Sequence, residues 1–205
     1  MRFIFKTSYA QDLRLAKHGG HLFWYGLLGL ALLAAPWFTP EYWLAQLTFV
    51  LIYAIVGLGL MLLAGYTGLF SLGHAAFLGV GAYTQAVLTG MGWPFLLSLA
   101  CAAGISAAVG VVVGLPAMRV KGIYLGMATL AFGFIVEEGF ARWESVTGGN
   151  SGKAVAMPEI FGVSLDSAMA FYFVCLAITV ACTLVILNLL RSPTGRAFVA
   201  IRDSE

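Results

Sequence analysis

Long apolar segments, separated by short polar or glycine- and proline-rich stretches, cover most of the chain. No Asp, Glu, Lys or Arg occurs between Tyr42 and Met118, and an α-helix needs only about 20 apolar residues to cross a bilayer. This stretch alone has room for three crossings. The whole pattern predicts an all-α, polytopic transmembrane helix bundle of about six membrane segments, at residues 22–38, 44–64, 74–89, 95–118, 123–140 and 171–190.

A glycine-rich stretch, residues 65–74, precedes the third segment and breaks it. Its sequence, GYTGLFSLGH, has neither the charge of a surface loop nor the uninterrupted apolar content of a lipid-facing helix. Irregular backbone at membrane depth persists only where protein or a water-filled cavity satisfies its amides. A helix break needed only for packing is the alternative. The residues predicted to line a solute pathway are Gly65, Tyr66, Gly68, Ser71, Gly73 and His74.

His74 is the one side chain of the uncharged stretch that gains or loses charge near neutral pH. An ionisable group at membrane depth suggests that it binds solute or protons. A neutral imidazole can also simply hydrogen-bond a neighbouring carbonyl, and the sequence leaves both interpretations open.

The fourth segment carries a face of small residues. Ser106, Gly110 and Gly114 recur every four residues and therefore share one side of a helix. Because small residues let helix backbones approach closely in lipid, another helix is expected to pack there.

The distribution of basic residues predicts the orientation, since cytoplasmic loops retain Lys and Arg. With six segments and a cytoplasmic N-terminus, only Arg142 and Lys153 fall outside. The domain plan is an interfacial N-terminal segment at 1–21, a permease domain at 22–190 and a cytoplasmic segment at 191–205. The basic residues on the cytoplasmic side are Arg2, Lys6, Arg14, Lys17, Arg119, Lys121, Arg191, Arg196 and Arg202.

Composition excludes a water-soluble domain, because 61% of the residues are hydrophobic and 10% are charged, against roughly 25% charged in soluble proteins. No phosphate-binding loop, metal-ligand spacing or Ser-His-Asp set occurs in the sequence. We therefore expect no catalytic residue, metal or cofactor, and no nucleic-acid partner. An ATP-driven function requires a separate ATPase subunit.

Four sequence blocks resemble the branched-chain amino acid permeases of the LivM type. They are GLMLLAGYTGLFSLGHAAFLGVGAYTQAVL, RVKGIYLGMATLAFGFIV, VTGGNSG and LLRSPTGRAFVAIRDSE, in the family's order and approximate spacing. The resemblance covers residues 44–205. It implies an inner-membrane subunit that works with a second, related permease, two cytoplasmic ATPases and a periplasmic binding protein.

The resemblance also assigns roles to two polar segments. It places the binding protein's docking face at Thr147, Gly148, Gly149, Asn150 and Gly152. It places the coupling to the ATPase at Thr194, Gly195, Arg196 and Arg202.

The chain departs from the family in two places. Many relatives have Glu where this chain has Phe134. Relatives also continue for several helices beyond Glu205, so we expect a C-terminally truncated chain that ends inside the coupling segment.

These observations predict the membrane-spanning permease subunit of an ATP-driven importer for branched-chain or other hydrophobic amino acids. Importers of urea or short-chain amides use similar permeases. In a different class, an ATP-independent carrier or channel would need buried carboxylates or a polar pore ring. A membrane-embedded enzyme would need polar groups clustered at one depth, where only His74 is available.

The predicted orientation can be tested by cysteine labelling in intact cells after the native cysteines are replaced. We expect Lys153→Cys to react with an impermeant thiol reagent and Lys121→Cys to be shielded, because these residues lie on opposite sides of the membrane. Labelling of the Lys121 position alone would reverse the orientation.

Overall fold

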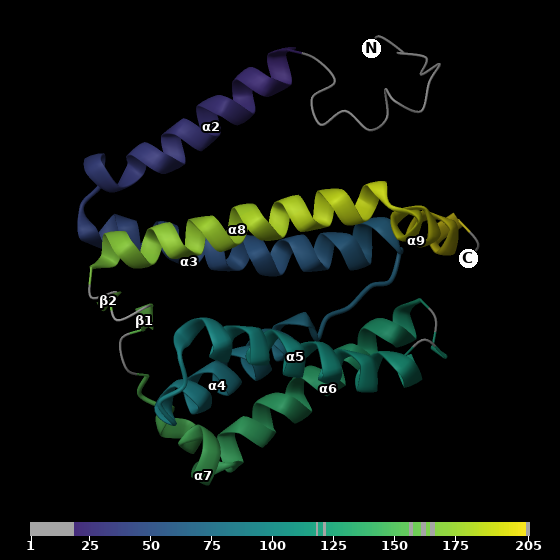
Figure 1. Ribbon diagram of the computed structural model, residues 1–205. Helices are drawn as coiled ribbons and strands as arrows, with labels where there is room; N and C mark the ends of the chain where they lie inside the picture. Colours follow the sequence, from purple (N-terminus) through teal and green to yellow (C-terminus); the bar gives the residue numbers. More distant parts are fainter. Residues whose placement is uncertain are drawn as a thin grey trace.

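The structure of the chain is a computed structural model that describes residues 19–117, 119–120, 122–155, 158–160, 163–164 and 167–203. The predicted interfacial segment at 1–21 lies almost entirely outside these residues, as does Lys121. Helices make up nearly all of the described chain (Figure 1). The all-α prediction is confirmed.

Six long helices and one short π-helix follow one another along the described chain. They are α2 (Gly19–Phe38), α3 (Glu41–Leu60), the π-helix η1 (Met61–Tyr66), α4 (His74–Gly90), α5 (Phe95–Ala117), α6 (Ile123–Arg142) and α8 (Ala168–Arg191). A short amphipathic helix, α9 (Pro193–Asp203), follows α8 directly.

Four helical stretches of the described chain are long and apolar enough to cross a membrane: Glu41–Tyr66, Phe95–Ala117, Ile123–Arg142 and Ala168–Arg191. Phe23–Phe38 is a shorter apolar helix. The polytopic membrane class is therefore confirmed. The count of six segments stays a prediction, because α4 has 17 residues and the first segment is short.

The buried core lies between α3 and α8, which run side by side (Figure 1). Leu44 and Leu51 of α3 pack against Tyr172, Cys175 and Leu176 of α8. The hydroxyl of the fully buried Tyr172 donates a hydrogen bond of 2.9 Å to the carbonyl of Leu32, which attaches α2 to this pair. A buried phenol needs such a partner.

A second group of helices, α4, α5 and α6, carries the small-residue face predicted in the fourth segment. The Ser106 hydroxyl donates to the carbonyl of Phe77 at 2.7 Å. A Cβ at Gly110 would lie 3.8 Å from the Phe77 ring. The helix expected at this face is thus α4, while nothing lies within 4 Å of the Cβ position of Gly114.

The polar segment between α6 and α8 contains short regular elements. It contains α7 (Glu144–Thr147), the 3₁₀ turn η2 (Gly149–Ser151) and two short strands, β1 (Glu159–Ile160) and β2 (Val163–Ser164). The strands pair antiparallel, with Glu159 opposite Ser164. Two-residue strands are too short for any alternation of polar and apolar residues to reveal them.

The two ends of the molecule differ in their elements. Figure 1 shows α9 at one end and α7 with the two strands at the other. Arg191, Arg196 and Arg202 lie in or next to α9, whereas Arg142 ends α6 beside α7. This separation agrees with the predicted orientation.

Candidate functional site

The helix is interrupted between η1 and α4, inside the bundle. After η1 the backbone is irregular at residues 67–73, and α4 begins at His74. Gly73 packs against Thr129, which lies six residues into α6, or about 9 Å along a helix axis. The predicted irregular backbone therefore exists, and it packs against a helix that is long and apolar enough to cross a membrane.

Its predicted bounds were too wide. Gly65 and Tyr66 belong to the π-helix and His74 to α4. The glycine-rich sequence favours a loop at Gly65 and Tyr66. In the structure α3 instead continues without interruption into the π-helix η1, which keeps the backbone helical as far as Tyr66.

Thr129 of α6 supports the break. Its Oγ1 accepts a hydrogen bond of 3.0 Å from the Leu72 amide and donates one of 2.9 Å to the Gly126 carbonyl. A Cβ at Gly73 would overlap the Thr129 carbonyl, so only glycine fits. Sequence reasoning missed Thr129, which stands within an apolar block where a hydroxyl has no distinctive signal.

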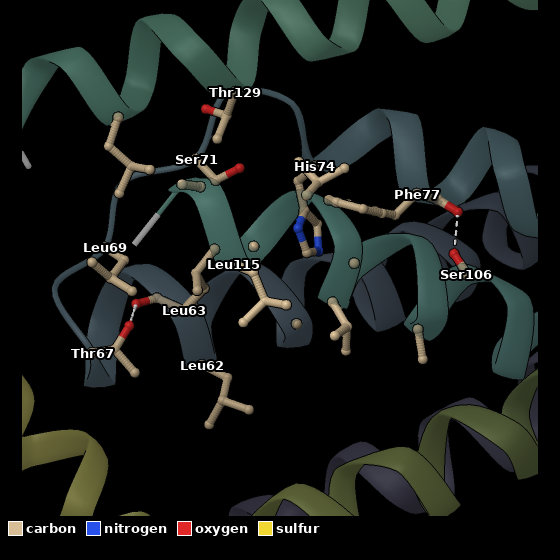
Figure 2. Close-up of a pocket in the computed structure, with 18 of the residues that line it drawn as sticks. Leu62, Leu63, Thr67, Leu69, Ser71, His74, Phe77, Ser106, Leu115 and Thr129 are labelled. Atoms are coloured by element: carbon tan, nitrogen blue, oxygen red, sulfur yellow. Dashed lines mark hydrogen bonds between the residues drawn. The ribbon is translucent and has the colours of Figure 1, made fainter. Parts of the chain in front are cut away.

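A cavity of about 700 Å³ lies beside the break. Its walls come from α3, η1, the irregular segment, α4, α5, α6 and Phe198 of α9. Figure 2 shows the His74 ring pointing from the start of α4 toward the space near Leu63 and Leu115. Among the described lining residues none is charged, and the polar ones are Thr67, Ser71, His74, Ser106 and Thr129.

The cavity contains two of the six residues predicted for the pathway, Ser71 and His74. Gly73 instead lines a smaller cavity of about 330 Å³ between α4 and α6. Gly65 and Gly68 face Arg202 of α9, and Tyr66 lines neither cavity. The pathway role of all six stays a prediction.

His74 both lines the cavity and packs α4 against α3. Its Nε2 would lie 3.1 Å from a Cβ at Gly59, and the ring interacts with the backbone of Val56. Phe77 stands edge-on to the imidazole at 6.1 Å. The two interpretations of His74 drawn from the sequence are solute or proton binding and a hydrogen bond to a neighbouring carbonyl. They are compatible, because the same ring lines the cavity and contacts α3.

Much of the cavity wall belongs to residues that sequence reasoning did not assign to the pathway. Gly110, Gly114 and Leu115 of α5 line it, together with Phe198. The four-residue glycine spacing was the available signal, but it predicts helix packing equally well. Gly110 does pack against Phe77, and Gly114 faces open space.

The predicted docking segment is a tightly built turn. Thr147 is almost fully buried, and its Oγ1 accepts a hydrogen bond of 3.1 Å from the Gly149 amide. Gly148 has φ +77°, and a Cβ there would overlap the Gly152 carbonyl. Asn150 and Gly152 are exposed. Thr147, Gly148 and Gly149 thus shape the turn, and among the five predicted residues Asn150 is the one that presents an exposed side chain.

All four predicted coupling residues lie in α9. Gly195 is buried in its first turn, where a Cβ would overlap the Leu190 carbonyl. Thr194 and Arg196 are exposed. The side chain of Arg202 reaches η1, and its Nη1 donates to the Gly65 carbonyl at 3.2 Å.

Neither cavity resembles a metal centre. In the described part of the chain, no three His, Cys, Asp or Glu side chains lie close enough together to hold an ion. The arrangement offers a mostly apolar cavity with a few hydrogen-bonding groups.

An uncharged cavity beside a broken helix in an apolar helix bundle is typical of a membrane transporter. Over residues 42–205 the chain matches the family described as branched-chain amino acid transport system / permease component. The chain belongs to this family.

Two curated relatives share this similarity. The high-affinity branched-chain amino acid transport system permease protein LivM of Salmonella typhimurium LT2 is 35% identical over 185 residues, which cover 77% of this chain and 43% of that protein. LivM of Escherichia coli K12 is 34% identical over 211 residues, covering 90% and 49%. The chain spans about half the length of these relatives. No solved structure matches it.

Replacing Gly73 by alanine tests the close approach at the break. We expect Gly73→Ala to lower the free energy of unfolding by about 1–3 kcal/mol, because the added methyl group forces the backbones apart. Gly90→Ala is the matched control, since the nearest atom to its Cβ position is Lys153 Cε at 3.9 Å. Unfolding in detergent measures both, and equal stability would contradict the contact.

Thr129→Val tests the hydrogen bond while keeping the side-chain shape. It leaves the Leu72 amide without its partner, so we expect a loss of about 1–3 kcal/mol in the free energy of unfolding. Thr183→Val removes a hydroxyl that donates only to the Thr179 carbonyl one turn earlier, and should cost less. Similar costs for the two variants would show that the Leu72 amide does not depend on Thr129.

Proposed function

We propose that the chain is the membrane-spanning permease subunit of an ATP-driven importer for branched-chain and other hydrophobic amino acids, in a bacterial inner membrane. The observation that carries this proposal is the uncharged cavity at the helix break, in a chain that belongs to the permease family. The printed names of both relatives, which describe branched-chain amino acid transport, support the substrate class.

The walls of the cavity suit an apolar side chain. Its volume of about 700 Å³ is within the usual range of roughly 300–1,000 Å³ for small-molecule sites. Leu62, Leu63 and Leu69 contribute apolar surface near the break, and Ser71 and His74 supply hydrogen-bonding groups. A solute with a short aliphatic side chain and one polar end matches this combination.

The proposed importer needs further subunits. They are a second, related permease, two cytoplasmic ATPases and a periplasmic binding protein. Two features support these partners: Asn150 is presented by a rigid turn at one end of the molecule, and Ala197 and Ala200 of α9 are exposed at the other. Solute passes from the binding protein through the cavity when ATP turnover moves the helices.

Urea or short-chain amides are the alternative substrates in the same class of importer. They are small and polar, so they gain little from a wall that is mostly apolar. A carrier driven by buried carboxylates is disfavoured by the lining, which has no Asp or Glu among the described residues.

The decisive experiment is uptake by proteoliposomes that contain the protein together with its permease partner, the ATPases and the binding protein. We expect leucine, isoleucine and valine to enter only with ATP, and urea to be a poor substrate. Uptake without the ATPase would favour a carrier or channel. Uptake of urea in preference to leucine would reassign the substrate.

Filling the cavity should block this uptake. Gly114 lines the cavity with open space at its Cβ position, so Gly114→Phe should reduce leucine uptake about tenfold without destabilising the protein. Gly104→Phe is the matched control on α5, because Gly104 also faces open space but lies away from the cavity. Uptake is normalised to the amount of protein in the membrane. Equal uptake by the two variants would remove the cavity from the pathway.

A further inference from the structure

A hydrogen bond joins α9 to the end of the π-helix that precedes the break. The Arg202 guanidinium donates from Nη1 to the Gly65 carbonyl at 3.2 Å. Gly65 belongs to the last turn of η1, where carbonyl groups have no partner within the helix. Arg202 thus satisfies a backbone group at the point where the membrane helix ends.

The backbone of α9 also packs closely on Gly68. A Cβ at Gly68 would lie 3.1 Å from Arg202 Cγ, 3.7 Å from its Cβ and 3.8 Å from its Cα. Gly68 has φ +75°, a conformation that glycine adopts at no steric cost. The close approach and the hydrogen bond together hold α9 against residues 65–68.

The same helix contributes to the cavity wall. Phe198 lies one turn before Arg202, on the same side of α9, and lines the cavity together with Thr67 and Leu69. At the other end of α9, Gly195 is buried against the Leu190 carbonyl. Any displacement of α9 therefore changes the cavity at Phe198.

We propose that Arg202 is a positioning residue that fastens α9 to residues 65–68, so that the helix and this edge of the cavity move as one body. The proposal rests on the proposed function, in which a cytoplasmic ATPase displaces α9. The attachment delivers that displacement to the irregular segment, and through Leu69 and Ser71 to the cavity. Without this attachment, α9 moves while residues 65–68 keep their position.

A disulfide can replace the attachment. The Cβ position of Gly68 lies 3.7 Å from Arg202 Cβ, within the range of about 3.5–4.5 Å found in disulfides. The Gly68→Cys/Arg202→Cys variant is made after Cys101, Cys175 and Cys182 are replaced, and is assembled with its transport partners. When reduced it lacks the guanidinium, and when oxidised it regains a link.

Gly68→Cys places a non-glycine residue at φ +75°, so the single Gly68→Cys variant is the reference for the double variant. We expect uptake per ATP hydrolysed to be about fivefold lower in the reduced double variant than in Gly68→Cys alone, the net effect of losing one hydrogen bond. Oxidation should restore it. Each single cysteine variant, the matched control, should not respond to oxidation. If no disulfide forms, or if oxidation lowers the ratio further, the two parts do not move together and the proposal is wrong.

Arg202→Ala tests the same role without new cysteines near the contact. It should lower uptake per ATP hydrolysed about fivefold, whereas a purely structural loss would lower both rates in proportion to protein abundance. Arg202→Lys keeps a donor and should recover part of the ratio. An unchanged ratio in Arg202→Ala would overturn the proposal.

A labelling experiment separates this proposal from the proposed function. With Ser71→Cys as the only cysteine, a small thiol reagent should react about fivefold faster after Arg202→Ala, because that edge of the cavity is loosened. This result does not require transport. If the unmodified protein shows no ATP-driven uptake, the proposed function fails. If it transports normally but neither labelling nor the coupling ratio responds to Arg202→Ala, only the role of Arg202 fails.

Discussion

The close packing of Gly73 against Thr129 holds the broken segment inside the bundle. A chain that leaves helical geometry at membrane depth must find partners for its amides, because lipid offers none. Thr129 provides one with its hydroxyl, and the absence of a side chain on Gly73 brings the backbones close enough for that bond. The position of α4, and with it one wall of the cavity, depends on this contact.

Two groups of helices surround the break, and they are held together in different ways. The α3–α8 pair contains the buried core and a phenol that ties down α2. The α4–α5–α6 group buries mainly small residues, such as Ala76 and Ala102, and uses Ser106 and Gly110 for close approach. In lipid the hydrophobic effect gives helices little reason to associate, so fit and hydrogen bonds determine which helices pair.

Sequence patterns predicted the helices well, because a long uncharged apolar stretch has few other stable states in a bilayer. They also located the break, since glycine and polar residues interrupt such a stretch visibly. They missed Thr129, whose partner lies 57 residues away, and they missed Phe198 as a wall of the cavity. Such contacts depend on how the helices pack, and the hydrophobic periodicity of one sequence carries no information about packing between helices.

The start of α4 beside the cavity has an electrostatic consequence. Because α4 begins at His74, which lines the cavity, and has no side-chain cap from Gly73, the N-terminal end of this helix lies at the edge of the cavity. A helix of this length carries roughly half a positive charge at its N-terminus. No described side chain that lines the cavity is charged, so this end of α4 adds a positive contribution at the edge of the cavity, which favours a carboxylate over a cation there.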